Sequence, residues 1–546
     1  MRVGLITFNA GYIHKALGLR WLYVCADKDQ TPVLLEFTTK TSVSEAVSII
    51  QENNLDVLAF SVSIWNAALT KEVIQELLKD QPRRIILGGP EVTYDNDDWF
   101  DLGIEAIILG EGEKAFWDYL KSGQASGAKT AKGQAAMVVR TPLSWLEQFS
   151  DPYTLDIDKD TMEKRYLYIE TSRGCPFRCS YCQASLDKPV RYFSLPYLKN
   201  VFSKLQNYQP KQVKFLDRTF NADKNWAKSI QELVCDFFTC SFQCEIMPEP
   251  LSSDEKQRMI LPAYKKRFRY EIGIQSFSPE VLKEIGRPQN NEAAIENLKY
   301  LLNNGVVCHV DLIAGLPYET LESFQKSFHM LYSLAPSELQ LGILKVLKGT
   351  GMHANAKDYE LVYHPQPPYE VIRTKWMSEA DIQACRDAAF GLDRLSRKHN
   401  FKTTVDAVLQ KGVAPFLCYQ SIGAALRKQE KPENLYATYQ TIHDALGKWL
   451  NQDELKQRLN FDFFLHVRVR CAAPFPLLSL DQKKHCSRDL IKKDFLKQEQ
   501  LPYLVMEQVR IDDTSVILCC VLSRQQDEAR QYVYNIQDGS FKEIYR

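Results

Sequence analysis

Three closely spaced cysteines carry the clearest chemical signal in the chain. Cys175, Cys179 and Cys182 stand in the segment ETSRGCPFRCSYCQ, directly after an apolar, strand-like run. Three thiolates from one loop can bind three irons of a [4Fe–4S] cluster, which leaves the fourth iron open to a substrate or cofactor. A structural zinc site normally has four ligands, and no second cysteine pair follows here. A disulfide framework is not expected in a chain of this length without a secretory signal. The spacing therefore predicts an iron–sulfur cluster with one open iron.

Polar residues at the ends of later strand-like runs form a second signal. Glu245 stands near the end of FQCEI, Gln275 ends YEIGIQ, Asp311 follows VVCHV, and Arg287 comes shortly after Gln275. Taken singly, each could cap a loop or belong to a structural ion pair. Their order after the cysteine loop favours one shared site, because the carboxyl ends of parallel strands meet on one face of a β/α barrel.

The cysteine loop and these strand ends together resemble the radical S-adenosylmethionine (SAM) superfamily, near its coproporphyrinogen-dehydrogenase-like branch. The resemblance implies that SAM chelates the open iron and that one electron cleaves it to a 5′-deoxyadenosyl radical. It implies that Glu245, Gln275, Arg287 and Asp311 surround SAM, and that the backbone of Tyr181 contacts the adenine. It also implies a low-potential electron donor, flavodoxin or ferredoxin, as a partner.

A further segment, Asp217-Arg218-Thr219-Phe220-Asn221, follows the second strand of this region. It resembles the D-R-T-F-N found in radical SAM proteins that carry a cobalamin domain. Many members of the superfamily bind the SAM amine through a Gly-Gly-Glu sequence near this point, which this chain lacks. We expect Asp217 or its neighbours either to take that role or to face cobalamin.

The first 125 residues alternate apolar strand-like runs with helical segments. This pattern predicts a doubly wound parallel sheet, whose ligands bind beyond the carboxyl ends of the strands. Glycines at these ends allow the backbone to approach a flat macrocycle closely. The order of the segments resembles the cobalamin-binding domains fused to radical SAM barrels. The residues that we expect at cobalamin are His14, Ser61, Trp65, Asn66, Gly88, Gly89, Gly110 and Gly112.

His14 leaves two alternatives open. Cobalamin-binding domains often have D-x-H-x-x-G after the first strand, with the histidine bound to cobalt, whereas here Tyr12 replaces the aspartate and Gly18 comes one place late. A ligating histidine usually needs a partner on its other nitrogen. We therefore favour a packing role or a contact at the cobalamin edge over ligation. Trp65 and Asn66 could line the lower face of the corrin ring, with core packing as the equal alternative for Trp65.

The domain prediction comprises four segments. Residues 1–125 form the cobalamin-binding domain, and 126–165 form a linker, since prolines and weak periodicity argue against a core element there. Residues 166–370 hold six strand-and-helix units, which predict a partial β/α barrel. Residues 371–546 are mostly helical with closing strands, which predicts an α+β domain of unknown function. It resembles an uncharacterised domain appended to some bacterial members of the group.

Composition narrows the function classes. Lys and Arg together number 68, as do Asp and Glu, so no net field favours nucleic acid or a membrane surface. No apolar run reaches the roughly 18 residues needed to span a bilayer. The cysteines are scattered without a pairing pattern, as expected in the reducing cytoplasm. We therefore expect a cytoplasmic globular enzyme.

The resemblance implies methylation of an unactivated carbon through a 5′-deoxyadenosyl radical and methylcobalamin. Two alternatives stay open: cobalamin-dependent radical cyclisation, rearrangement or oxidation without methyl transfer, and a non-catalytic cobalamin or redox sensor. A methylthiotransferase is disfavoured, because it would need further cysteines in the N-terminal domain, where Cys25 is the only one before Cys175. The sequence does not identify the substrate.

Overall fold

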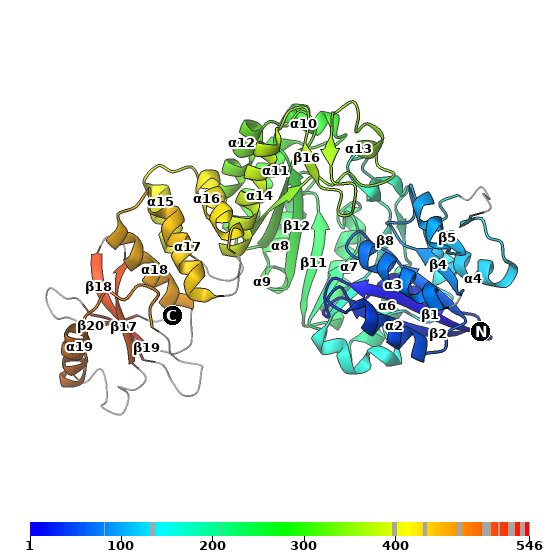
Figure 1. Ribbon diagram of the computed structural model, residues 1–546, viewed down its shortest axis with the longest axis horizontal. Helices are drawn as coiled ribbons and strands as arrows, with labels where there is room; N and C mark the ends of the chain where they lie inside the picture. Colours follow the sequence, from blue (N-terminus) through cyan, green and yellow to red (C-terminus); the bar gives the residue numbers. More distant parts are fainter. Residues whose placement is uncertain are drawn as a thin grey trace. The chain divides into compact units, whose positions relative to one another are not determined.

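A parallel sheet, a barrel-like set of strands and helices, and a helical region follow one another along the chain in the computed structural model (Figure 1). The structure describes residues 1–80, 82–131, 137–208, 210–395, 401–429, 434–466, 472–493, 504–511, 514–521, 530–534 and 541–544. The chain divides into two units. The first contains Met1–Thr320, Leu334–Ser337 and Ile343–Glu379, and the second contains Leu321–Ser333, Glu338–Gly342 and Ala380–Arg546.

The N-terminal sheet has six strands in the order β2-β1-β3-β4-β5-β6. The strands are β1 (Arg2–Asn9), β2 (Thr31–Thr38), β3 (Val57–Ser61), β4 (Arg84–Gly88), β5 (Ala106–Ile108) and β6 (Ala128–Thr130). The first five are parallel and are connected through α1 (Leu17–Val24), α2 (Val43–Glu52), α3 (Ala67–Asp80) and the short η1 (Asp97–Leu102), and α4 (Gly112–Ser122) follows β5. The predicted doubly wound parallel sheet is confirmed, with its core formed around Phe8, Phe60 and Trp99.

The segment expected to be a linker contains one sheet element. β6 pairs antiparallel with β5, and Val139 forms a bridge with Gly110. The short helices α5 (Leu143–Leu146) and η2 (Asp156–Lys164) follow. The prediction of no core element was wrong for this strand, because a three-residue edge strand gives too short a pattern to recognise.

A buried group of charges joins the N-terminal sheet to the segment before the barrel. Arg20 on α1 contacts Asp158 (Nε to Oδ2, 2.7 Å) and Glu36 on β2 (Nη2 to Oε2, 2.7 Å). Lys15 contacts Asp158 at 3.1 Å, and Arg165 contacts Glu36 at 3.1 Å. All five side chains are at most 10% exposed. Buried charges persist only when they are paired, so these contacts fix the segment 156–165 against the sheet.

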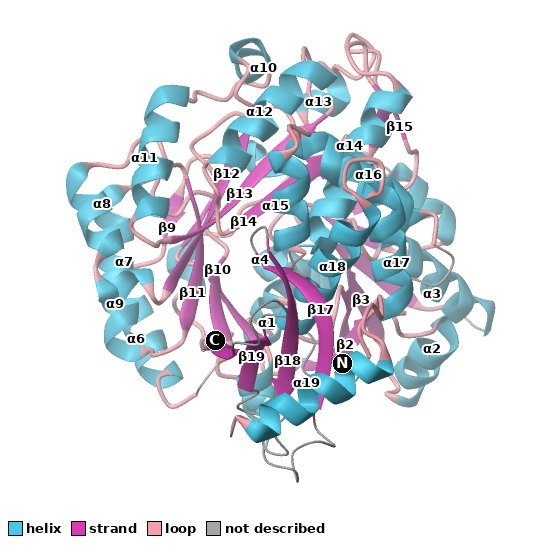
Figure 2. Ribbon diagram, turned by 90° about the vertical axis from the view of Figure 1, so that its left-hand side faces the viewer, coloured by secondary structure: helices cyan, strands magenta, loops and turns pink. Residues whose placement is uncertain are grey.

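The central region is a six-stranded sheet in the order β14-β13-β12-β11-β10-β7 (Figure 2). Its strands are β7 (Tyr166–Ile169), β10 (Gln212–Phe215), β11 (Ser241–Ile246), β12 (Phe268–Gln275), β13 (Val307–Ala314) and β14 (Glu338–Ile343). The helices between the strands of the first unit are α6 (Leu195–Leu205), α7 (Lys224–Phe237), α8 (Ser253–Ile260), α9 (Pro262–Lys265), α10 (Pro279–Glu284) and α11 (Asn291–Asn303). β11 and β13 alternate strictly between buried and half-buried residues. One face therefore packs under the helices, while the other presents polar side chains, as the predicted partial barrel requires.

The second unit is mainly helical, which confirms the predicted α+β class. It contains α12 (Leu321–Ser333), α14 (Glu379–Arg394), α15 (Lys402–Gln410), α16 (Pro415–Arg427), α17 (Leu435–Leu446), α18 (Gln452–His466) and α19 (Leu480–Lys492). An antiparallel sheet is formed by β17 (Leu504–Ile511), β18 (Thr514–Val521), β19 (Arg530–Tyr534) and β20 (Phe541–Ile544). No helix in the described ranges is long and apolar enough to cross a bilayer.

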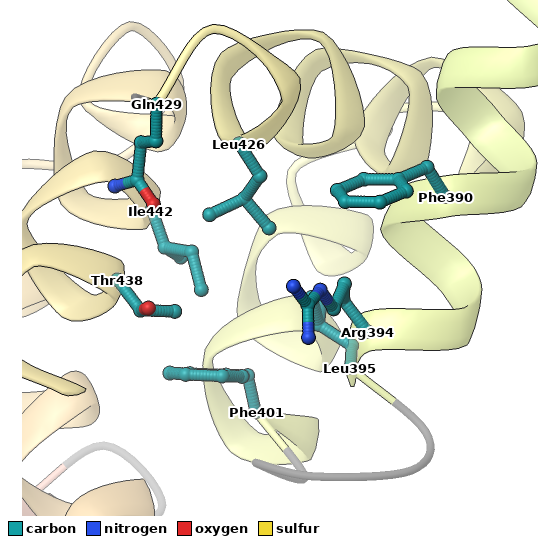
Figure 3. A pocket seen from close by; sticks show the side chains of 8 residues that line it. All are labelled: Phe390, Arg394, Leu395, Phe401, Leu426, Gln429, Thr438 and Ile442. Carbon is teal, nitrogen blue, oxygen red and sulfur yellow. The ribbon is translucent and has the colours of Figure 1, made fainter. Parts of the chain in front are cut away.

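A small cavity lies among the helices of this unit (Figure 3). Phe390 and Arg394 of α14, Phe401, Leu426 of α16 and Ile442 of α17 are among the side chains that line it. Its volume is about 20 Å³. That volume holds about one water molecule, so the cavity is a packing gap rather than a binding site.

Candidate functional site

The three cysteines stand between β8 (Ser172–Arg173) and the short helix η3 (Gln183–Leu186). All three are free thiols; Cys175 and Cys179 are buried and Cys182 is half-buried. Among the described residues, no three His, Cys, Asp or Glu side chains gather as ligands of a single ion would. A [4Fe–4S] cluster does not require this, because each thiolate binds a different iron. Burial raises the pKa of Cys182, and bound iron would offset that effect by stabilising the thiolate. The donor set therefore fits the cluster.

Backbone contacts from distant segments hold the cysteine loop in place. Ser180 donates its N–H to the carbonyl of Ile285 (2.9 Å) and accepts a hydrogen bond from the N–H of Met352 (2.8 Å). Gly286 has a φ of +64°, and a Cβ there would lie 3.1 Å from the carbonyl oxygen of Arg178. The loop is thus positioned by the turn after α10 and by the start of the short helix α13 (Gly351–Ala354).

Arg287 and Tyr181 lie beside Cys179. Nη1 of Arg287 is 3.8 Å from the sulfur of Cys179, and Nη2 donates to the carbonyl of Gly273 and lies 2.9 Å from the sulfur of Met247. Burial raises the pKa of Tyr181, and the neighbouring Cys179 raises it further, while the charge of Arg287 opposes the shift. The structure therefore brings Arg287, which is far from the cysteines in sequence, next to the cluster loop.

Gln275 adopts an unusual backbone conformation at the end of β12. Its φ is +68°, and the register between β12 and β13 shifts between Gly273 and Gln275. A Cβ on Gly273 would overlap Nε2 of Gln275, so the fold of this side chain requires a glycine there. Oε1 of Gln275 is buried and has no hydrogen-bond partner among the described residues. A strained residue with an unused buried acceptor is a typical feature of a ligand site.

Glu245 and Asp311 complete the predicted set on neighbouring strands. Glu245 pairs in register with Glu271, and Asp311 pairs with Gly273. Burial raises the pKa of Glu245 to about 7, and the carboxylates of Glu271 and Asp311 add to this shift. Oδ1 of Asp311 lies 3.1 Å from Nε2 of His309. The two acids and Gln275 therefore share the polar face near the carboxyl ends of β11, β12 and β13.

Asp217 does not have the environment that we expected for a cofactor contact. Its Oδ1 accepts hydrogen bonds from the hydroxyls of Thr171 (2.5 Å) and Ser172 (2.6 Å), and its Oδ2 accepts from the N–H of Thr171 (3.1 Å). The residue is 1% exposed. Its hydrogen bonds hold the segment before Cys175 instead, and its neighbour Arg218 reaches the cavity described next.

A cavity of about 460 Å³ lies where the N-terminal sheet meets the barrel. Five of the predicted residues line it: Ser61, Gly88, Gly89, Gly110 and Gly112. The other wall includes residues next to the cysteine loop: Glu170, Ser172, Arg173, Gly174, Gln183 and Arg218. The carboxyl ends of the N-terminal strands and the flanks of the cysteine loop therefore share one cavity.

Two of these glycines are required by the fold itself. Gly89 has a φ of +105°, and a Cβ would lie 2.5 Å from the carbonyl oxygen of Val62. Gly110 has a φ of +89°, and a Cβ would overlap the carbonyl oxygen of Val139. A Cβ at Gly88 or Gly112 would meet no atom closer than 3.7 Å. The expected reason, close approach of backbone to a macrocycle, is thus available only at Gly88 and Gly112.

His14 does not line this cavity. Its Nδ1 is 2.5 Å from the hydroxyl of Tyr168 on β7, and its ring also packs near Tyr166. Burial lowers the pKa of His14, and the charges of Lys214 and Arg165 lower it further. The packing alternative is the one that the structure favours, because the imidazole packs against Tyr166 and Tyr168 of the first barrel strand and is not among the residues that line the cavity.

Trp65 and Asn66 are also absent from the cavity wall, in contrast to our expectation. Trp65 is 56% exposed and donates its indole N–H to the carbonyl of Phe8 (3.2 Å). Asn66 is buried, donates to the carbonyls of Phe8 and Ser61, and accepts from the N–H of Ser63 (2.8 Å). Both side chains stabilise the turn after β3, which explains their position without a ligand.

An ion-pair network at the cavity wall was missed from the sequence. Arg173 contacts Glu113 (2.8 Å), Glu170 (2.8 Å) and Glu111 (3.2 Å), and Arg191 also contacts Glu111 (2.5 Å). Arg173 is 9% exposed. It stands two positions before Cys175, so the network links the LGEGE loop of the N-terminal domain to the cysteine loop. The sequence does show that the LGEGE segment and the segment before Cys175 each follow a strand-like run. The ion pairs between them, however, depend on how the two domains pack.

Family comparisons agree with this arrangement. The model of the B12 binding domain matches residues 3–120, the model of the radical SAM superfamily matches 169–331, and a protein family of unknown function, DUF4080, matches 357–518. These matches do not define the domain boundaries that we predicted, which stay a prediction.

Several curated proteins are similar to the chain at low identity. An uncharacterized methyltransferase of Pyrococcus horikoshii is 23% identical over 341 residues, which cover 58% of this chain and 72% of that protein. The cobalamin-dependent radical SAM methyltransferase TokK of Streptomyces tokunonensis is 23% identical over 360 residues, covering 57% of this chain and 48% of TokK. An anaerobic magnesium-protoporphyrin IX monomethyl ester cyclase of Rubrivivax gelatinosus is 22% identical over 335 residues, covering 54% and 56%. The chain thus spans about half the length of the last two.

Solved structures share the fold. The cobalamin-dependent SAM radical enzyme OxsB with aqua-cobalamin bound matches 91% of this chain and 81% of its own, with a TM-score of 0.60 and 13% identity. The radical SAM methyltransferase TsrM from Kitasatospora setae, with cobalamin and a [4Fe–4S] cluster bound, covers 67% of this chain and 76% of its own, with a TM-score of 0.54 and 16% identity. The cofactors of this chain are accordingly a [4Fe–4S] cluster, S-adenosylmethionine and cobalamin. The chain is a radical SAM enzyme with an N-terminal B12-binding domain and a C-terminal domain of the DUF4080 type.

Proposed function

We propose that this enzyme transfers a methyl group to an unactivated carbon of its substrate. The observation that carries the proposal is the shared cavity, in which glycine-rich strand ends of the B12-binding domain face Ser172, Gly174 and Gln183 around the cysteine loop. When bound, the cluster with SAM supplies a radical that abstracts hydrogen, and cobalamin supplies the methyl group. A reaction that uses both needs the two cofactors on one cavity.

We propose that the polar face of the barrel binds SAM. Gln275 offers a buried acceptor for a hydroxyl or amine of SAM, and Glu245 and Asp311 offer carboxylates on the adjacent strands. Arg287 stands beside Cys179 and would bind the SAM carboxylate next to the cluster. The positions support the proposal, because Arg287 lies beside the cysteine loop while Glu245, Gln275 and Asp311 stand on the neighbouring strands β11, β12 and β13.

We propose that His14 does not ligate cobalt. Ser61 and the glycines at the ends of β4 and β5 border the cavity, whereas the ring of His14 is not among its lining residues and bonds to Tyr168. A low-potential electron donor, flavodoxin or ferredoxin, is the proposed source of electrons.

A second candidate is a cobalamin-dependent cyclisation or oxidation without methyl transfer. The similarity to the anaerobic magnesium-protoporphyrin IX monomethyl ester cyclase favours it, because its identity of 22% is close to that of the methyltransferases. The same cavity could serve either reaction, so the products must decide.

Product analysis tests the proposal. Anaerobically reconstituted protein, given SAM and a low-potential reductant, should release both 5′-deoxyadenosine and S-adenosylhomocysteine. Release of 5′-deoxyadenosine alone would refute methyl transfer and favour the second candidate, and release of neither would support a sensor. The triple variant Cys175→Ala, Cys179→Ala, Cys182→Ala should release no 5′-deoxyadenosine. Cys235→Ala, a half-buried thiol on α7, is the matched control and should retain the activity.

A further inference from the structure

Arg218 differs from the other arginines that line the cavity. Arg140 pairs with Asp187 at 2.6 Å, and Arg173 pairs with three glutamates. Arg218 has no hydrogen bond from its guanidinium and no ion pair with any described residue. Its sequence neighbour Asp217 is not its partner: the oxygens of that carboxylate accept hydrogen bonds from Thr171 and Ser172 instead. The cavity therefore contains an exposed guanidinium that forms neither an ion pair nor a hydrogen bond with the described residues.

The position of Arg218 connects the two halves of the site. It follows β10, and its side chain lines the cavity together with Leu216, Ser172 and Gln183. Its positive charge opposes the rise in pKa that burial causes at Glu245 on β11. The guanidinium therefore lies within electrostatic range of the polar barrel face and reaches the cavity next to the B12-binding domain.

We infer that Arg218 binds an anionic group of the substrate, a carboxylate or a phosphate, and thereby determines substrate specificity. The inference rests on the proposed function, in which the substrate must lie between the cluster and cobalamin. A guanidinium presents five N–H donors in a planar fork that matches a carboxylate or a phosphate in a bidentate contact. The substrate class is accordingly an organic acid or a phosphate ester that holds its reactive carbon at a fixed distance from the anion.

Two cofactors could supply the same chemistry. The SAM carboxylate is an anion, but Arg287 already lies beside the cluster loop, with Nη1 3.8 Å from the sulfur of Cys179, and is the proposed partner of that carboxylate. Cobalamin carries a phosphate, but the cavity residues expected at cobalamin, such as the glycines after β4 and β5, belong to the N-terminal sheet, whereas Arg218 follows β10 of the barrel. If the anion belongs to the substrate, Arg287 stays available to SAM and the glycine-rich strand ends stay available to cobalamin. The experiment below distinguishes the substrate from both cofactors.

The experiment uses the full chain reconstituted with cluster and cobalamin, titrated anaerobically with succinate and with inorganic phosphate in a calorimeter. We expect saturable binding of at least one probe to the unmodified enzyme. Arg218→Gln should weaken that binding by about tenfold or more, because a charge-assisted contact is lost. Arg218→Lys should weaken it less, because lysine keeps the positive charge and loses only the planar fork. Arg178→Gln is the matched control, since Arg178 is an exposed arginine of the cluster loop outside the cavity, and it should leave probe binding unchanged.

Affinity for SAM and retention of cobalamin are measured on the same variants. Both should be equal in Arg218→Gln and the unmodified enzyme. A loss of SAM affinity or of cobalamin would assign the guanidinium to a cofactor and overturn the inference. Equal probe binding with and without Arg218, or no saturable binding to the unmodified enzyme, would also overturn it. None of these readouts depends on product formation, so failure here is distinguishable from failure of the proposed methyl transfer.

Discussion

Replacement of Arg173 tests the ion-pair network between the B12-binding domain and the cysteine loop. In Arg173→Met, Glu113 and Glu170 lose their only arginine, while Glu111 keeps Arg191. Glu113 is 6% exposed, so its charge would be left buried with the hydroxyl of Thr141 as a hydrogen-bond donor but without its arginine. Breaking a buried pair by removing one member costs roughly 3–5 kcal/mol. We expect the free energy of unfolding at pH 8 to fall by about that amount.

The effect should depend on pH in a direction that follows from burial. Burial raises the pKa of Glu170 even with Arg173 present, and loss of the arginine removes the main opposing charge. A carboxyl group whose pKa is higher in the folded state binds its proton preferentially there, so the free energy of unfolding falls as pH rises. The difference between Arg173→Met and the unmodified protein should therefore shrink from pH 8 toward pH 5.

Urea denaturation followed by tryptophan fluorescence at both pH values measures this difference. Arg84→Met is the matched control, because Arg84 also makes a two-pronged contact with a glutamate, Glu105, but in a pair that is 45% and 29% exposed. Exposed pairs contribute about 0–1 kcal/mol. If Arg173→Met were no more destabilising than Arg84→Met, or if its effect were the same at pH 5 and pH 8, the reasoning would be refuted.

Three further predictions concern the cofactor sites. Gly89→Ala should lower the unfolding midpoint in urea clearly more than Gly18→Ala, because Gly89, unlike Gly18, combines a positive φ with the close carbonyl of Val62. Equal shifts would contradict this. In the cob(II)alamin-loaded enzyme, His14→Gln should leave the electron paramagnetic resonance spectrum unchanged; loss of nitrogen coupling in the variant would instead establish ligation. SAM affinity should rise as pH increases through about 7, where Glu245 becomes ionised and can accept a hydrogen bond from the SAM amine. Glu245→Gln should abolish that rise, and a pH dependence retained in this variant would assign it to another group.

The sequence predicted the elements that carry the site better than the orientation of single side chains. Cys175, Gln275 and the glycines of the strand ends were found because strand-like runs place the residues that follow them at one edge of a sheet. The side chains of Gln275 and Arg287 meet near Gly273 as a consequence of the positive φ at Gln275, which no local pattern announces.

The sequence was least informative where a side chain faces another domain or its own turn. His14 stands in the predicted loop, yet Tyr168 of the first barrel strand binds its ring. Asn66 stands at the predicted strand end, yet it satisfies the carbonyls of its own turn. The contact of His14 is determined only when the two domains are packed together, and that of Asn66 by which carbonyls of the turn need a donor.

The buried charges around Arg20 have a consequence for any fragment of this protein. A fragment that ends near residue 125 retains Arg20 and Glu36 but lacks Asp158 and Arg165, and Lys15 then has lost its carboxylate. The B12-binding sheet is therefore electrostatically complete only when the chain continues at least to Arg165, at the start of the first barrel strand. We therefore expect the cofactor-binding sheet and the entry to the barrel to unfold together, although their sequence patterns belong to two families.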